Sequence, residues 1–482
     1  MCTLNKALLR AAMFLLLFLP ALYGQANQKC RAIILTDIEA DPDDTQSMIR
    51  LLLYSNEIEI KGLIATTSIH QRSNVYPESI RRLIRAYAKV QANLLRHAAG
   101  YPEADSLLQL VKQGLPVYGL QGVGVGQDSP GSDWIIKELD ENDQRPLWVC
   151  VWGGPNTLAQ ALYKIEKNRS KNEVKRLLAQ LRVYTISDQD DSGLWIRKNF
   201  PDLFYIVSPG GYENSTWGAI HQFVQGINNQ TVSNSWLAHN IQQGHGPLGA
   251  LYPDVGYGME GDTPSFLSLI PNGLNVPERP DWGGWGGRYE RYIPGYASFN
   301  FGFTGGVPIE PESREIWSNA IDKYEPYQIS EYGRAVQKDT VTFTGNRVTL
   351  WRWRDDIQND FAARMDWCIK SYPMANHPPV PVLAHPEQIT VQSGSGFWLD
   401  AGGTHDPDGD NLSYLWFHYP EPGSFKKEIK IASAENLYRV FLLAPEVDKT
   451  EIAHFILRVT DKGDPPLSRY KRVLVTIEPK SR

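Results

Sequence analysis

The chain has 482 residues, of which 42% are hydrophobic and 21% are charged. This composition is that of a folded protein, and the length is enough for two or more domains. The formal net charge of -6 argues against a nucleic-acid groove or an anionic membrane surface as the partner.

Residues 1–24 are typical of a secretory signal peptide. Lys6 and Arg10 form its positive region, residues 11–19 are apolar, and small residues follow near Ala21. The apolar run is too short to be a membrane-spanning helix, and we expect no membrane span later in the chain. The sequence therefore predicts a periplasmic or secreted protein.

Strands and helices alternate through the first large segment. Strands are expected at residues 32–35, 58–66, 147–151, 182–186 and 203–207, and helices at 45–54, 79–95, 157–166 and 355–372. Such alternation predicts an α/β fold with a mostly parallel sheet that is covered by helices. Residues 244–305 are rich in Gly, Pro, Trp and Tyr, which favours ordered loops over a site.

The pattern changes after residue 375. Residues 376–382 form a proline-rich linker, and beyond it short alternating strands are expected at 388–392, 413–418, 455–459 and 472–477. No long helix separates these strands, which is typical of a β-sandwich of about 100 residues. The predicted organisation is an α/β domain at residues 28–375 and a small all-β sandwich at residues 383–482.

Five carboxylates crowd into the sequence Asp37-Ile38-Glu39-Ala40-Asp41-Pro42-Asp43-Asp44, between a predicted strand and a predicted helix. Crowded carboxylates repel each other unless a cation lies among them. Ligand sets made only of oxygen suit calcium or magnesium, and open α/β sheets bind ligands at the carboxyl ends of their strands. The alternative is a solvated loop in which Asp43 or Asp44 caps the following helix.

Residues 37–44 resemble the Asp-x-Asp-Pro-Gly-x-Asp-Asp signature of nucleoside hydrolases, with Glu39, Ala40 and Asp41 in place of Asp, Pro and Gly. Residues 62–67 resemble the second strand of that fold. Residues 153–159 resemble the segment that gives calcium a backbone carbonyl. Residues 260–264 resemble the late motif that supplies a distant calcium ligand. The four landmarks occur in the expected order, which makes the resemblance more specific than any one of them.

Three further segments, residues 186–191, 200–204 and 282–290, resemble the secreted bacterial family of cellulose-binding proteins with a nucleoside hydrolase-like domain. In that family a β-sandwich follows the hydrolase-like domain, as is predicted here. The resemblance covers nearly all of the chain after the signal peptide. It implies a nucleoside hydrolase-like fold followed by an Ig-like or PKD-like sandwich.

The resemblance also implies a calcium site. Its ligands would be Asp37, Glu39, Asp44, Asp262 and the carbonyl of Gly153. In nucleoside hydrolases the second Asp of the signature takes a proton from the attacking water, and the resemblance gives this role to Glu39. By the same resemblance, Asp43 would hydrogen-bond the sugar. The side chain of Glu39 is one methylene longer than that of Asp, so its carboxylate is displaced by roughly 1.5 Å.

Other residues are candidates for contacting a substrate. His70 and His245 either protonate the leaving group or only line the site. Trp282 and Trp285 either stack on a sugar or pack in the core. The remaining candidates are Asn156, which follows the strand at 147–151, and Glu213 and Asn214, which resemble a sugar-contacting segment before Trp217.

The predicted sandwich contains one more acidic motif, His405-Asp406-Pro407-Asp408-Gly409-Asp410. It resembles the Asp-Pro-Asp-Gly-Asp turn of PKD-like and cadherin-like sandwiches. Its alternate aspartates either bind a structural calcium ion or form a plain Asx turn.

Two functions remain open at this point. The first is a secreted, calcium-dependent hydrolase of a glycosidic or N-ribosidic bond, acting on a sugar, nucleoside or glycan. The second is a non-catalytic protein that binds cellulose or another carbohydrate on the same fold. A third interpretation is an adhesion or scaffold protein whose sandwich does the binding. The sequence leaves the oligomeric state undecided.

Overall fold

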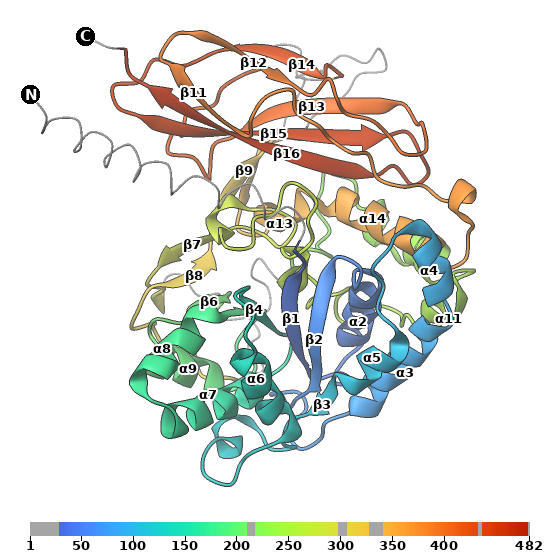
Figure 1. Cartoon of the computed structure of the whole chain (residues 1–482), viewed down its shortest axis with the longest axis vertical. Coiled ribbons are helices and arrows are strands. Elements are labelled where there is room, and N and C mark those ends of the chain that lie inside the picture. The colour runs from blue at the N-terminus through green and yellow to red at the C-terminus, as the bar shows by residue number, and fades with distance from the viewer. Residues whose placement is uncertain (1–27, 210–216, 297–305, 327–340, 432–435, 481–482) are drawn as a thin grey trace, which may run out of the picture.

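A computed structural model describes residues 28–209, 217–296, 306–326, 341–431 and 436–480 (Figure 1). An eight-stranded sheet of order β3-β2-β1-β4-β5-β6-β8-β7 forms the centre of the first domain. Its strands pair in parallel except at the edge, where β7 is antiparallel to β8. The strands are β1 Cys30–Thr36, β2 Ile58–Ala65, β3 Val111–Gln113, β4 Leu147–Val151, β5 Leu181–Thr185, β6 Phe204–Val207, β7 Tyr289–Tyr292 and β8 Ile316–Asn319.

Helices cover both faces of this sheet, with α2, α3 and α14 on one side and α6, α7 and α9 on the other (Figure 1). Alternate residues of β1 enter different cores, Ile34 on the α2 side and Leu35 on the α7 side, because successive side chains of a strand point to opposite faces. The predicted α/β class is confirmed. The helices are α2 Asp43–Leu53, α3 Pro77–Ala88, α4 Gln91–His97, α5 Ala104–Gln109, α6 Pro130–Asp140, α7 Asn156–Asn168, α8 Lys171–Gln180, α9 Ser192–Asn199, α10 Asn234–Leu237, α11 Gly246–Gly249, α12 Pro264–Leu267, α13 Val348–Trp351 and α14 Arg354–Asp366.

Two helices differ from the sequence prediction. The helix expected at residues 79–95 is divided into α3 and α4, because the Lys89 N–H bonds to the Ala86 carbonyl and ends the first helix. Helix α14 ends at Asp366 instead of residue 372. The N–H groups of Cys368 and Ile369 bond three residues back, to the carbonyls of Met365 and Asp366, so the last turn tightens and the helix ends well before Pro373.

The C-terminal domain is a β-sandwich, as predicted. A four-stranded sheet of order β11-β16-β15-β13 faces a two-stranded sheet of β12 and β14. Their inward side chains, among them Trp416, Phe455 and Val440, form one hydrophobic core. The strands are β11 Gln388–Gln392, β12 Gly396–Asp400, β13 Leu412–Tyr419, β14 Arg439–Leu443, β15 Glu451–Asp461 and β16 Ser468–Glu478.

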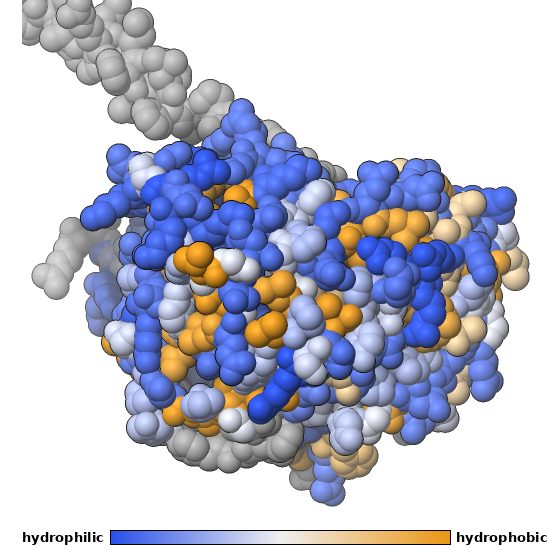
Figure 2. Space-filling model, turned by 90° about the horizontal axis from the view of Figure 1, so that it is seen from below, coloured by the Kyte–Doolittle hydropathy of each residue, from blue (hydrophilic) through white to orange (hydrophobic). Residues whose placement is uncertain are grey.

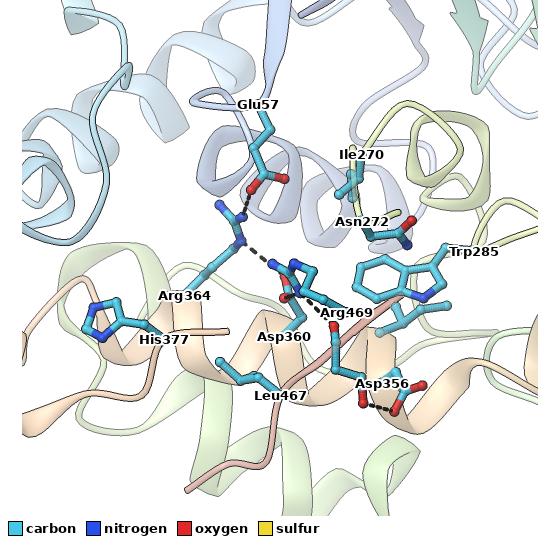
Figure 3. Close-up of polar contacts among 12 residues, drawn as sticks. Glu57, Ile270, Asn272, Trp285, Asp356, Asp360, Arg364, His377, Leu467 and Arg469 are labelled. Atoms are coloured by element: carbon cyan, nitrogen blue, oxygen red, sulfur yellow. Dashed lines mark hydrogen bonds and ion pairs between the residues drawn. The ribbon is translucent and has the colours of Figure 1, made fainter. Parts of the chain in front are cut away.

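The sandwich packs directly on the α/β domain through β16 and α14 (Figures 1 and 3). Arg469 of β16 donates to Asp360 of α14 at 2.6 Å, and Arg364 donates to the other oxygen of Asp360 at 3.2 Å. Burial alone would raise the pKa of Asp360, but these two guanidinium groups lower it to about 2. Trp285 is fully buried beside Tyr470 of β16. The hydrophobic core of the first domain therefore continues into the second.

The predicted linker is anchored at its start. Asn376 and His377 are buried. The side-chain amide of Asn376 donates to Asp461 at 2.9 Å, and the backbone N–H of His377 donates to Asp408 at 2.7 Å. The first residues after the α/β domain thus belong to the packed junction between the two domains.

None of the helices in the described ranges combines the length and the apolar character that crossing a membrane requires. Figure 2 views the molecule from the side opposite the sandwich. On this face, apolar residues lie in patches that are separated by polar residues.

Candidate functional site

Three loops meet at the carboxyl edge of the central strands. They follow β2, β1 and β4, which are neighbours in the parallel sheet. Backbone hydrogen bonds join the loops: the Thr66 N–H donates to the Thr36 carbonyl at 2.8 Å, and the Gly154 N–H donates to the Thr67 carbonyl at 2.9 Å. The acidic segment 37–44 thus lies where α/β sheets bind ligands.

Four aspartates of this region are buried: Asp37, Asp43, Asp44 and Asp262, each with no more than 4% of its surface exposed. Thr36 donates to Asp44, and the Trp217 indole donates to Asp43 at 2.9 Å. The second oxygen of Asp262 is inaccessible to solvent and has no hydrogen-bond partner. A buried carboxylate oxygen without a partner is costly, so the site needs a further group there.

The electrostatics of the four aspartates point to a cation. Burial raises the pKa of Asp37 to about 6, and burial raises the pKa of Asp43, Asp44 and Asp262 well above the usual range. For Asp262, every further large influence is another carboxylate, and each of them raises the pKa again. Such a set of oxygen atoms suits calcium, which takes six to eight oxygen ligands. The residues present therefore fit the calcium ion that the sequence resemblance implies.

The loop that carries Asp262 is held to α2 by a buried ion pair between Arg50 and Glu260. Both oxygens of Glu260 accept from the guanidinium of Arg50, and Thr263 and Tyr252 donate to them at 2.8 and 2.7 Å. Arg50 and Glu260 have no exposed surface. Because α2 begins at Asp43, this ion pair connects the two halves of the acidic site.

Glu39 lies on the rim of the site. Its backbone has a φ of +81°, a strained conformation for a residue other than glycine. About 41% of its side chain is exposed, and its carboxylate lies 3.5 Å from the guanidinium of Arg82 on α3. The structure therefore places Glu39 outside the buried group of aspartates, and its roles as base and metal ligand remain predictions.

Asp41 is the carboxylate that the sequence comparison undervalued, because it aligned with the glycine of the nucleoside hydrolase signature. The structure brings Asp41 together with Asp43 and Asp44, and one oxygen of each lies within 4.8 Å of the others. The Asp43 N–H also donates to Asp41 at 3.1 Å. The number of acids in the segment was the signal that could have identified it.

Gly153 lies against the site, as the sequence suggested. A Cβ at this position would lie 2.6 Å from Oδ1 of Asp37, so only glycine lets the backbone approach that carboxylate. Asn156 is buried nearby. Its amide donates to Thr67 at 2.9 Å and to the Val117 carbonyl at 2.7 Å, and its oxygen accepts from Thr66 at 2.8 Å. Asn156 therefore joins the loops after β2 and β4.

The two histidine candidates lie in different surroundings. His70 is close to the acidic loop: burial lowers its pKa, and the carboxylate of Asp41 partly opposes that shift. His245 is buried beside α14, where its Nε2 lies 3.3 Å from Asp366. His70 is thus the histidine that the structure brings to the acidic site.

The two tryptophan candidates lie at the domain junction. Trp285 is fully buried, and its indole donates to the Tyr470 hydroxyl at 3.3 Å, so it is not available to stack on a ligand. Trp282 packs edge-on against His454 of the sandwich, with a centroid distance of 4.9 Å. Of the two alternatives considered for them, packing is the one that the structure favours. Glu213 and Asn214 lie outside the described residues.

Two aromatic residues near the acidic loop were missed as site residues. Trp217, which bonds Asp43, was noted only as the end of the Glu213 segment. Tyr257 is exposed and follows Gly256, where an added Cβ would lie 3.2 Å from the ring of Pro42. Exposed aromatic rings beside a polar site are suited to stacking on sugars. The Gly- and Tyr-rich composition of residues 244–305 was the signal for Tyr257.

Comparisons with known proteins agree with this architecture. Residues 31–289 match the family model described as cellulose-binding Sde182, nucleoside hydrolase-like domain. Residues 396–477 match the model described as cellulose-binding protein Sde0182, C-terminal domain. No curated protein matches the chain.

A solved structure of similar sequence is that of a nucleoside hydrolase-related protein from Saccharophagus degradans, which is associated with carbohydrate metabolism. It is 33% identical, with 94% of this chain and all of that chain covered, and its TM-score is 0.76. The type III effector XopQ, solved with adenosine diphosphate ribose, is 10% identical over 66% of this chain and 93% of its own, with a TM-score of 0.28. The second likeness is too weak to carry an inference.

Proposed function

Because the chain belongs to the family of cellulose-binding proteins with a nucleoside hydrolase-like domain, we propose that it is a secreted, calcium-dependent hydrolase of a glycosidic bond. The substrate contains a sugar. An N-ribosidic bond is the special case that the nucleoside hydrolase-like fold suggests. The site is the group of buried aspartates at the carboxyl edge of β1, β2 and β4.

The observation that carries this proposal is the environment of Asp262. Its unpartnered, solvent-inaccessible oxygen lies among carboxylates that all raise its pKa. Buried charges are normally paired or bound to metal. Asp37, Asp44 and Asp262 would hold a calcium ion, with Gly153 offering its carbonyl. When bound, the ion supplies an anchor for sugar hydroxyls and a lower pKa for water.

The chain's own residues then have separate tasks. Asp43 is oriented by Trp217 and is available to hydrogen-bond the sugar. Glu39, on the solvent side of the loop, takes a proton from the attacking water as general base. The remaining carboxylates stabilise the positive charge that develops on the sugar ring when a glycosidic bond breaks. The carboxylate of Asp41 acts on the pKa of His70 against the effect of burial, so His70 is a further polar group beside the same loop.

The experiment is an assay of the purified protein against a panel of nucleosides and oligosaccharides, with calcium or with chelator. We expect release of sugar or base only with calcium, and Glu39→Gln is expected to lower kcat by about 10²–10⁴-fold while glycan binding is retained. Asp41→Asn is the matched comparison, since it removes the neighbouring charge of the same loop. If the wild-type protein releases nothing with calcium, the hydrolase proposal fails; if only Asp41→Asn abolishes turnover, the base is Asp41.

A second candidate function is non-catalytic binding of a glycan by the sandwich, and the outer face of β12 and β14 favours it. Trp398 and Phe441 pair across these strands, each about half exposed, with ring centroids 5.1 Å apart. The guanidinium of Arg439 lies 4.2 Å from the Trp398 ring centroid and forms an ion pair with Asp400 at 3.2 Å. Aromatic faces beside polar groups match the apolar faces and hydroxyls of a sugar ring.

For this second function we expect Trp398→Ala to weaken retention on cellulose by about 10-fold, the effect of truncating one central aromatic contact. The measurement is a binding isotherm on microcrystalline cellulose. Tyr257→Ala is the control, because it removes an exposed aromatic at the acidic loop instead. Loss of binding in Tyr257→Ala with full binding in Trp398→Ala would place the glycan at the acidic site and exclude the sandwich face.

A further inference from the structure

The segment of residues 186–191, one of those that resemble the cellulose-binding family, follows β5 at the carboxyl edge of the sheet. Asp188 near its start forms an ion pair with Arg197 of α9 at 2.7 Å. Asp191 at its end accepts the Leu120 N–H at 2.8 Å, which joins the segment to the loop after β3. The segment is therefore held firmly on both sides of its two middle residues.

Gln189, the first of these two residues, connects the segment to the loops after β2 and β4. Its side-chain amide donates to the carbonyl of Trp152, the residue before Gly153. Its own backbone carbonyl accepts the Ile69 N–H at 2.7 Å. Gln189 is buried, so water does not compete for these hydrogen bonds. Gln189 therefore fixes the chain on the N-terminal side of Gly153.

Asp190 fixes the chain on the other side of Gly153. It has no exposed surface, and its Oδ1 accepts both the backbone N–H of Ser192, at 2.8 Å, and the hydroxyl of the same residue. Its Oδ2 accepts the N–H of Asn156, the first residue of α7, at 3.3 Å. A Cβ on Gly154 would lie 2.3 Å from that same oxygen, so the carboxylate lies directly against the Gly154 backbone. Asp190 thus braces the turn that leads from Gly153 into α7.

The three successive carbonyls of this turn differ in their partners. The carbonyl of Trp152 accepts from Gln189, and the carbonyl of Gly154 accepts from the Thr66 hydroxyl at 3.3 Å. The carbonyl of Gly153, between them, accepts no hydrogen bond from any residue that the structure describes. Gly153 is buried, and a buried carbonyl is normally paired. The middle carbonyl is therefore the one left for a ligand.

On the basis of the calcium site of the proposed function, we infer that Gln189 and Asp190 are positioning residues, which hold the Gly153 carbonyl toward the cation among the buried aspartates. Neither is a ligand, and each fixes one side of the peptide group that is. Calcium takes oxygen ligands at about 2.3–2.6 Å, whereas magnesium requires about 2.0–2.1 Å in a near-ideal octahedron. A carbonyl that cannot move inward disfavours the smaller ion, so the two residues also set the choice of cation.

The test is calorimetric titration of the full chain, stripped with chelator, with calcium chloride and separately with magnesium chloride. The binding phase that is lost in Asp262→Asn identifies the acidic site. Gln189→Met keeps the length of the side chain and removes the amide that holds Trp152. It is expected to lower calcium affinity by about 10–100-fold, the effect of losing a supporting group of a metal site, and to lower magnesium affinity less. The ratio of the two affinities is the readout, because a general loss of structure would lower both alike.

Gln160→Met is the matched control. Gln160 is also a buried glutamine whose amide holds a loop carbonyl, that of Gly124 at 3.0 Å, but it serves the loop of residues 122–128 instead of the turn at Gly153. It is expected to lower Tm about as much as Gln189→Met and to leave both affinities unchanged. Ser192→Ala is a milder second variant, since the Ser192 N–H stays on Asp190, and is expected to lower calcium affinity about 3- to 10-fold.

Two results would overturn the positioning role while the calcium site stands. One is wild-type calcium affinity in both Gln189→Met and Ser192→Ala, and the other is an equal loss of affinity for both cations in Gln189→Met. If Gln189→Met does not fold, Ser192→Ala decides alone, and wild-type calcium affinity in that variant rejects the role. If the wild-type chain shows no calcium-binding phase that Asp262→Asn removes, the calcium site of the proposed function fails together with this role.

Discussion

Arg50→Met is expected to lower the free energy of unfolding by about 3–5 kcal/mol, the largest stability effect of any single change considered for this chain. The substitution leaves Glu260 as a buried charge without its partner, since both groups have no exposed surface. It also removes the guanidinium that lies 3.9 Å from the ring centroid of Phe361. Denaturant unfolding, followed by fluorescence, measures the change.

The double variant Arg50→Met with Glu260→Met separates the two causes of this loss. Replacing a buried ion pair by apolar residues of similar volume is often neutral or stabilising, so the double variant is expected to recover most of the loss. The surface ion pair Arg81–Glu78 is the matched control. Arg81→Met is expected to lower the free energy of unfolding by no more than about 1 kcal/mol. A loss in Arg50→Met no larger than that of Arg81→Met would show that the pair contributes little.

Asp262→Asn is expected to lower calcium affinity at the acidic site by at least about 10²-fold, because loss of a direct ligand should exceed the 10- to 100-fold effect of losing a supporting group. Hydrolysis should fall with it. In the absence of calcium, Asp262→Asn is expected to be more stable than the wild type. Burial and four neighbouring carboxylates raise the pKa of Asp262, so removing that charge stabilises the folded state. Calorimetric titration and thermal unfolding in chelator measure the two effects.

The sign of the stability change distinguishes a metal ligand from a structural residue. A carboxylate whose pKa is raised in the folded state destabilises the fold as the pH rises through that pKa, so the gain in Asp262→Asn should be largest at neutral pH and vanish in acid. If Asp262→Asn instead lowers Tm in chelator at neutral pH, Asp262 serves the fold and the calcium proposal loses its main support.

The fold could be predicted from the sequence where a strand stood out as a short apolar run or as a regular alternation of apolar and polar residues. The strand at residues 147–151 coincides with β4, and the strand at 388–392 coincides with β11. Strands β12 and β14 were missed because their exposed outer faces carry large apolar residues, Trp398 and Phe441, which hide the alternation between buried and exposed positions. Alternation with large apolar residues on both faces does not indicate which side faces solvent.

The candidate site was predictable where one segment supplied it. Asp37, Asp43 and Asp44 were found because a strand end and a helix start enclose them. Trp285 illustrates the limit, since its Gly-rich surroundings suggest a loop over a ligand, whereas the structure buries it against Tyr470 of the other domain. A contact between residues 185 positions apart leaves no local signal in the sequence.

The continuous contact between the two domains has a consequence for how this protein can be divided. Tyr419, Ile456 and Tyr470 of the sandwich belong to the same hydrophobic cluster as α2 and α14. Truncation after residue 376 would therefore expose an apolar surface of the α/β domain that the sandwich covers. The two domains are expected to unfold in one cooperative transition. Each half depends on the other as a subunit of an obligate dimer depends on its partner, within one polypeptide.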